Sequence, residues 1–185
     1  MSTADHDDDR HAAEELMWQG RFIAARRRGR WEYVSRTRNI GAAVILAIDE
    51  GADGRHVILI DQYRVPLGRR CIELPAGLVG DEEAGEAPTL AAMRELEEET
   101  GYRAGRMIDL GAFQSSPGMV TESFTLFRAL DLEKVGDGGG VPGEDICVHR
   151  VRIDSLADWI AARRAEDFAI DVKLLILLGG AMIAD

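Results

Sequence analysis

One stretch of this chain, residues 80–102, constrains its structure and chemistry more than any other. It reads Gly80-x5-Glu86-x7-Arg94-Glu95-Leu96-x-Glu98-Glu99-x-Gly101-Tyr102. Pro88 suits the first turn of a helix, and Gly101 lies where a helix commonly ends. The residues between them are mostly good helix formers. We therefore predict a helix over residues 88–100.

Three glutamates share one face of this predicted helix. Residues three or four positions apart lie side by side on a helix, which groups Glu95, Glu98 and Glu99 and places Arg94 one turn before Glu98. Carboxylates this close repel one another and would destabilise a plain surface helix. A divalent cation removes the repulsion, and an all-oxygen cluster suits Mg²⁺ or Mn²⁺. The alternative is a solvated acidic face, but it does not explain why Gly80, Gly101 and Arg94 accompany the acids at this spacing.

The stretch resembles the signature of the Nudix hydrolases, which cleave a nucleoside diphosphate linked to another group. Tyr102 departs from the pattern, because an aliphatic residue is more usual there; this difference concerns packing and not chemistry. The resemblance implies an α/β/α sandwich with a mixed sheet, in which the signature forms a loop, a helix and a loop. The irregular mixture of strands and helices in the rest of the chain independently favours the α+β class.

The resemblance also implies roles for the signature residues and their neighbours. Glu95, Glu98 and Glu99 would hold Mg²⁺ or Mn²⁺ together with the main-chain carbonyl of Ala76. Arg94 would orient the glutamates through a salt bridge and transfer no proton.

Features outside the signature resemble the ADP-ribose pyrophosphatase subgroup. Pro117 follows Gly101 by sixteen residues, as in that subgroup, although Ser-Pro-Gly is also ordinary turn chemistry. The resemblance places Arg64 on the substrate's phosphates, where a guanidinium offers a planar, two-pronged donor. Glu73 either binds the ligand or ends a strand, and Met119 is a further candidate for substrate binding.

The N-terminal region contains the pair Trp31 and Glu32. In the enzymes that the chain resembles, this region forms a small sheet that crosses to a partner subunit, where aromatic residues enclose the adenine. The resemblance therefore implies a homodimer with Trp31 and Glu32 in substrate binding. Packing between the two subunits explains Trp31 equally well.

In the subgroup that the chain resembles, a flexible acidic loop supplies a glutamate to the catalytic centre, and the corresponding loop here follows the glycine-rich residues 136–143. Glu144 is the first candidate for the base or for an additional metal contact, and Asp145 is the second. The chain departs from related enzymes with several glutamates in this loop, because Val141 and Pro142 stand before Gly143. Glu122 is the third candidate for the base.

The remaining sequence suggests one catalytic domain with an N-terminal extension. We expect a disordered tail over residues 1–12, an N-terminal β-arm over 13–40 that serves dimerisation, and the Nudix domain over 41–185. Two helices are predicted near the end, over residues 155–164 and 167–182. Strands are predicted over residues 22–25, 31–35, 41–48, 56–63, 71–74, 107–113, 123–130 and 146–153.

The composition narrows the possible partners. A net charge of −11 argues against nonspecific binding to nucleic acid or to anionic membranes. The longest apolar run, residues 174–178, is far too short to cross a bilayer, and the polar first residues show no secretory signal. We expect a cytoplasmic protein.

The resulting functional prediction is metal-dependent hydrolysis of ADP-ribose to AMP and ribose 5-phosphate. Another nucleoside diphosphosugar or dinucleotide, such as GDP-mannose, ADP-glucose or NADH, is the nearer alternative. A non-catalytic sensor of ADP-ribose is the other, although such proteins usually lose signature acids.

Overall fold

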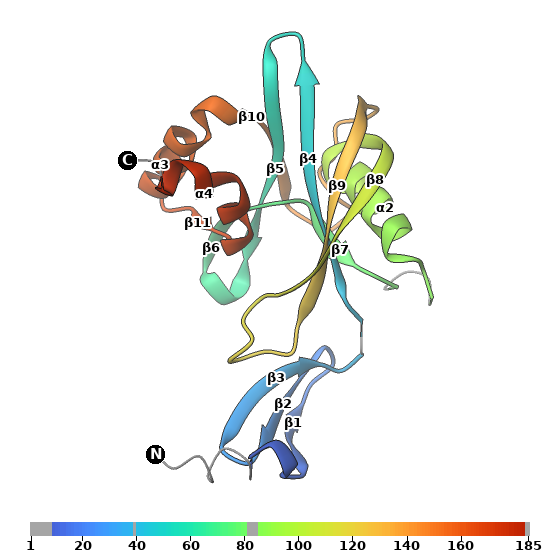
Figure 1. The fold of residues 1–185 in the computed structure, drawn as a ribbon, viewed down its shortest axis with the longest axis vertical. Coiled ribbons are helices and arrows are strands. Elements are labelled where there is room, and N and C mark those ends of the chain that lie inside the picture. The colour runs from blue at the N-terminus through green and yellow to red at the C-terminus, as the bar shows by residue number, and fades with distance from the viewer. Residues whose placement is uncertain (1–8, 39, 81–84, 184–185) are drawn as a thin grey trace.

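A mixed β-sheet between two helical layers forms the main body of the protein (Figure 1). The computed structural model describes residues 9–38, 40–80 and 85–183. Helix α2 (Pro88–Thr100) covers one face of the sheet, and α3 (Leu156–Ala165) and α4 (Leu175–Ile183) cover the other. The predicted α+β class and the sandwich architecture are confirmed.

The large sheet follows the order β11-β6-β5-β4-β9-β8, with β10 paired to β5 and β7 paired to β4. It is mixed because the β4–β9 and β6–β11 pairs are parallel while the other pairs are antiparallel. Its strands are β4 (Ala42–Gly51), β5 (Gly54–Arg64), β6 (Arg69–Glu73), β7 (Ala76–Leu78), β8 (Tyr102–Gln114), β9 (Ser123–Lys134), β10 (Ile146–Arg152) and β11 (Ala169–Ile170).

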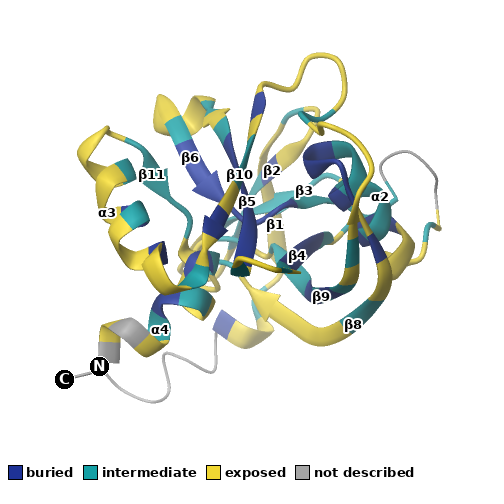
Figure 2. Cartoon of the chain, turned by 90° about the horizontal axis from the view of Figure 1, so that it is seen from above, coloured by how far each residue is buried: buried dark blue, intermediate teal, exposed yellow. Residues whose placement is uncertain are grey.

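Alternation along the central strand β4 builds two separate cores. Ala43 and Ile45 pack in the cluster that contains Leu96 of α2. Val44 and Leu46 point to the other side, into the cluster formed with α3 and α4. Successive side chains of a strand point to opposite faces, so one apolar run serves both helical layers. Figure 2 shows the buried residues concentrated in these central strands.

Helix α2 has the bounds that the sequence predicts. Pro88 is its first residue, and Gly101 closes it in the left-handed conformation at φ +68°, with its N–H bonded to the carbonyl of Glu97 at 2.8 Å. A side chain at Gly101 would also collide with the backbone of the glycine-rich loop. Glycine is therefore required for two reasons, the left-handed conformation and the close approach of the loop. Tyr102 is buried in the core beside α2.

A three-stranded sheet precedes the main domain and projects from one end of it (Figure 1). It consists of β1 (Glu14–Gln19), β2 (Ile23–Arg28) and β3 (Trp31–Arg36). The N–H of Val34 donates to the carbonyl of Met119 at 2.9 Å, and its own carbonyl accepts from Thr121 at 3.0 Å. These bonds join β3 to the loop between β8 and β9.

Several elements differ from the sequence prediction. The final helix starts later than residue 167, because Ala169 and Ile170 first pair with β6 and a 3₁₀ turn, η3 (Val172–Leu174), follows. Strands β1 and β7 were not predicted, and β8 begins at Tyr102 instead of residue 107.

The expected disordered tail lies mostly outside the described residues, but its last part is ordered. Asp9–His11 form a helical turn. The buried carboxylate of Asp9 accepts bonds from the backbone N–H and the guanidinium of Arg30 at 2.9–3.1 Å. Among the described residues, no helix is long and apolar enough to cross a bilayer.

Candidate active site

The signature helix borders a polar cavity of about 460 Å³. The cavity lies where α2 meets β7, the ends of β4, β5 and β9, and the glycine-rich loop before β10. Its charged lining residues are Arg36, Arg64, Glu73, Arg94, Glu95, Glu98, Glu99, Glu122, Glu144 and Lys173.

Glu99 is the most deeply placed of the signature acids. It is 5% exposed, and its carboxylate accepts a bond from the backbone N–H of Ala76 at 2.9 Å. Burial raises the pKa of Glu99 to about 8, and the charges of Glu95 and Glu144 act in the same direction. Burial also raises the pKa of Glu95, to which Glu98 and Glu144 contribute. Burial in the first place, and repulsion among the carboxylates in the second, therefore disfavour the charged form of both acids.

Arg94 supplies the positive charge within this group. Its guanidinium lies 3.0 Å from the carboxylate of Glu95 and 2.9 Å from that of Glu98. It also bonds to Glu86, which lowers the pKa of Glu86, while the hydrogen bond with Glu86 raises the pKa of Arg94. These ion pairs join Arg94 to three acids of the signature.

The donor set fits a hard divalent cation in its chemistry. Glu95, Glu98 and Glu99 offer only oxygen, and the raised pKa values show that the site favours added positive charge. A Cβ atom at Gly77 would overlap the carboxylate of Glu95, so the glycine allows Glu95 to lie directly against the backbone of β7. In the described part of the chain, no three acidic, His or Cys side chains already surround one point, and Arg94 occupies oxygens of two of them.

Arg64 and Glu73 form another charged pair in the lining of the cavity. The Nε and Nη2 atoms of Arg64 donate to the two carboxylate oxygens of Glu73 at 2.6 and 2.8 Å. This bond raises the pKa of Arg64 and fixes the plane of its guanidinium. Among the described residues, its Nη1 has no hydrogen-bonded partner, so it is available to a phosphate oxygen. Glu73 contacts Arg64 and thereby helps to position it.

The three acids considered as the base lie in different surroundings. Glu144 lines the cavity, and its carboxylate accepts from the backbone N–H of Val141 at 3.1 Å. Asp145 instead pairs with Arg70 at 2.6 Å and does not line the cavity. Glu122 lines it but is bound to the guanidinium of Arg36 at 2.9 Å.

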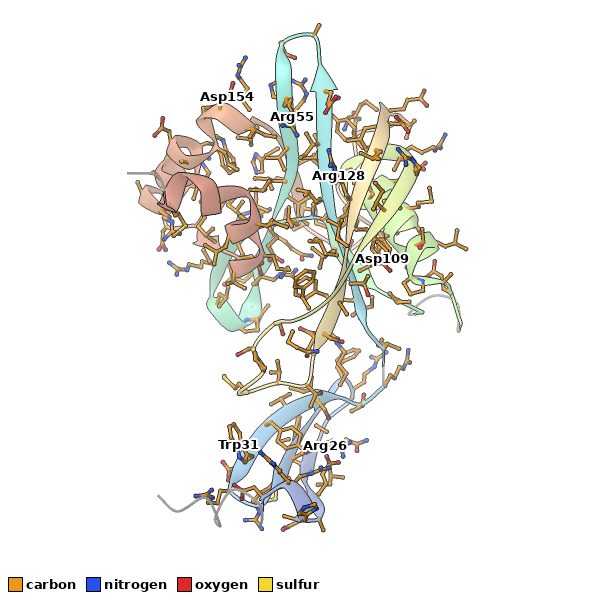
Figure 3. All side chains as sticks on the ribbon, in the orientation of Figure 1. Arg26, Trp31, Arg55, Asp109, Arg128 and Asp154 are labelled. Carbon is orange, nitrogen blue, oxygen red and sulfur yellow. The ribbon has the colours of Figure 1, made fainter. Side chains whose placement is uncertain are left out.

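Three predicted substrate contacts lie away from this cavity. Trp31 and Glu32 belong to β3, and Trp31 is 53% exposed on the small sheet, well apart from α2 (Figure 3). Met119 lies in the β8–β9 loop, where its carbonyl binds Val34 and its side chain is exposed. Trp31 faces a separate hollow that it shares with Pro117.

The cavity also contains residues that the sequence did not single out. Arg36, Gln62 and Phe124 come from the ends of β3, β5 and β9, and Lys173 comes from η3. Lys173 is bonded to Asp171 at 2.7 Å and lies 5.7 Å from the ring of Phe124. No local motif marks these positions, because tertiary packing alone brings them to the cavity.

The charge distribution indicates which chemistry the cavity suits. Four acids come from α2 and the loop before β10, while Arg36, Arg64 and Lys173 lie elsewhere on the lining, and each of these three bases is paired with an acid. A cation bound by the acids of α2 and a polyanion bound by the bases would complement these charges, which suits a metal-bound diphosphate.

Comparisons with known proteins agree with this chemistry. Residues 37–169 match the NUDIX domain family. The methanol dehydrogenase activator of Bacillus methanolicus is 34% identical over 131 residues, which cover 70% of this chain and 68% of that protein. The ADP-ribose pyrophosphatase of Bacillus subtilis is 44% identical over 93 residues (50% and 46% of the two chains). The GDP-mannose pyrophosphatase of an Enterobacter species is 34% identical over 150 residues (76% and 72%).

The fold has a counterpart among solved structures. The crystal structure of an ADP compounds hydrolase superimposes with a TM-score of 0.66 over 92% of this chain and 91% of that chain. The sequences are 23% identical, so this match concerns the fold.

Proposed function

The chain belongs to the Nudix hydrolase family, and from this premise we propose that it hydrolyses the diphosphate bond of ADP-ribose to AMP and ribose 5-phosphate. The 44% identity with an ADP-ribose pyrophosphatase supports this substrate. The observation that carries the proposal is the convergence of the signature glutamates, Glu144 and Arg64 on one cavity.

Mg²⁺ or Mn²⁺ is the proposed cofactor. The carboxylates of Glu95, Glu98 and Glu99 and the carbonyl of Ala76 would hold it. When bound, such an ion neutralises charge on a diphosphate and makes a coordinated water more acidic. Arg94 would keep Glu95 and Glu98 in place through its salt bridges with them.

The protein's own groups would perform the remaining work. Arg64, fixed by Glu73, binds the diphosphate and holds it in register for attack. Glu144 accepts the proton of the attacking water, as a carboxylate within reach of the reacting atoms can. Its place in the cavity favours it over Asp145, which is bound to Arg70 on the outside.

We further propose that the active protein is a homodimer. Trp31 and Glu32 lie outside the cavity of their own chain, on a sheet with several exposed apolar side chains. An arm that reached a partner would place Trp31 beside the partner's substrate, where a flat aromatic face suits a purine.

GDP-mannose is the second candidate substrate. The match with a GDP-mannose pyrophosphatase extends over 76% of this chain, further than the match with the ADP-ribose enzyme. ADP-glucose and NADH would use the same diphosphate chemistry.

Substitution on α2 tests the site. We expect Glu98→Gln and Glu99→Gln each to lower kcat for ADP-ribose by roughly 10²-fold or more while the fold survives. Glu97→Gln is the matched control, because Glu97 lies on the same helix, pairs with Arg103 outside the cavity and should leave kcat unchanged. Full activity in both cavity variants would refute the site.

A further inference from the structure

Glu144 follows a glycine-rich loop, residues 136–143, whose backbone is bonded to the signature helix. The N–H of Gly139 donates to the carbonyl of Glu99 at 2.9 Å, and the N–H of Gly140 donates to the carbonyl of Glu98 at 3.0 Å. These carbonyls lie in the last turn of α2, where helical partners are lacking. The loop thus binds the main chain of the same two residues whose side chains line the cavity.

Two glycines permit this close approach. A Cβ atom at Gly138 would lie 2.6 Å from the carbonyl oxygen of Glu99, and at φ +75° the position also disfavours other residues. A Cβ atom at Gly140, at φ +79°, would overlap the carboxylate of Glu144 and lie 3.0 Å from its Cβ. Side chains at these positions would therefore push the loop from the helix or displace Glu144 itself.

A second anchor holds the other side of Glu144. Arg70 donates to the carboxylate of Asp145 at 2.6 Å and to its carbonyl oxygen at 2.8 Å. Arg70 is in turn bonded to Asp61, which is 2% exposed and also bonds to His149 at 2.6 Å. Asp145 is therefore linked through Arg70 to Asp61, a buried carboxylate on β5.

We propose that these two anchors make Gly138, Gly140 and Arg70 positioning residues that hold Glu144 in its catalytic place. The proposal rests on the proposed function, in which Glu144 acts on the attacking water. Only residues 141–144 lie between the two anchored segments, so Glu144 belongs to a short stretch of chain that is held at both ends. A base held in this way needs little ordering during the reaction, and a small displacement of it is costly.

Steady-state kinetics of Gly138→Ala test the positioning role. We expect kcat to fall by about tenfold or more while KM changes by less than about threefold, because the loop positions a reacting group and not the substrate. Gly136→Ala is the matched control. Gly136 lacks the positive φ, and its added Cβ would meet only Gly101 Cα at 4.0 Å, so both constants should stay near the wild-type values.

A double-mutant cycle distinguishes positioning from a general structural effect. If Gly138 acts through Glu144, adding Gly138→Ala to Glu144→Gln should change kcat by less than about twofold. Arg70→Lys should show the same split and the same loss of effect in the Glu144→Gln background. An equal fall of kcat with and without the Glu144 carboxylate would overturn the proposal.

Hydrogen exchange of the amides separates this proposal from the proposed function. The amides of Gly139 and Gly140 should be protected in the wild type and in Gly136→Ala, and should exchange faster in Gly138→Ala. Wild-type kcat in Glu144→Gln would remove the role of Glu144 while leaving the anchors intact. Faster exchange in Gly138→Ala with wild-type kcat, in a protein that needs Glu144, would refute the positioning role.

Discussion

Glu99 is the acid of the cavity with the strongly raised pKa. Its carboxylate is buried against the backbone of β7, and burial raises its pKa to about 8 from an ordinary value of 4.5. A carboxyl group with a higher pKa in the folded than in the unfolded chain binds its proton more tightly when folded. Its contribution to stability is therefore lost progressively as the pH rises from about 4.5 to about 8.

This shift predicts the pH dependence of stability without metal. In the presence of a chelator, the free energy of unfolding of the wild type should fall relative to Glu99→Gln between pH 5 and pH 8, roughly the interval between the two pKa values. Mg²⁺ should stabilise the wild type more at the upper end of this interval, because the carboxylate is then charged. Urea titrations of both proteins measure the difference, and a difference that does not change with pH would contradict the assignment.

Helix α2 shows how much a single element reveals from its sequence. The spacing of Pro88, the glutamates and Gly101 is local, so it predicted both the helix and the acids that line the cavity. The resemblance to the ADP-ribose pyrophosphatases, and not the local pattern, pointed to Glu144, which lines the cavity. Arg36 and Lys173 were missed because only tertiary packing places them there.

Packing of α2 predicts a large loss of stability on truncation. Leu96 is fully buried between the helix and the sheet, so Leu96→Ala should lower the free energy of unfolding by about 2–5 kcal/mol. Leu90 on the same helix is 59% exposed, and Leu90→Ala should change it by less than about 0.5 kcal/mol. Equal effects of the two substitutions in denaturation experiments would show that α2 does not pack as described.

Elements whose formation depends on remote partners were harder to predict. Strand β1 is exposed along its whole length, so it lacks the alternation of a half-buried strand, and ion pairs of Glu14 and Glu15 with β2 support it. Residues 169–170 form a strand only because β6 offers a free parallel edge. Asp171 then starts the 3₁₀ turn by accepting from the N–H of Lys173, which delays the final helix.

At the scale of the whole molecule, the small sheet places Arg36 in the lining of the cavity but leaves Trp31, which is proposed to bind substrate, outside it. Its contacts with the main domain run through β3 and the β8–β9 loop, including the bond between Arg36 and Glu122. Trp31 lies at the far end of this sheet (Figure 3). The proposed dimer would account for this separation, because Trp31 would then lie at the cavity of the partner subunit.

Mixing two variants with different defects tests this arrangement. Trp31→Ala should raise KM for ADP-ribose with little change in kcat, while Glu98→Gln should have almost no turnover. In a mixed dimer, one site would combine intact acids from the first variant with an intact Trp31 from the second. Activity at low substrate should therefore recover after subunit exchange, whereas purely additive rates would show that each chain builds its own site.

Product analysis tests the central claim most directly. The purified protein would be incubated with Mg²⁺ and, separately, ADP-ribose, ADP-glucose, GDP-mannose or NADH, with Glu98→Gln as the blank. We predict that AMP and ribose 5-phosphate form from ADP-ribose faster than products form from any other compound. Faster cleavage of GDP-mannose would contradict the substrate assignment but keep the site, and tight ADP-ribose binding without cleavage of any compound would contradict hydrolysis itself.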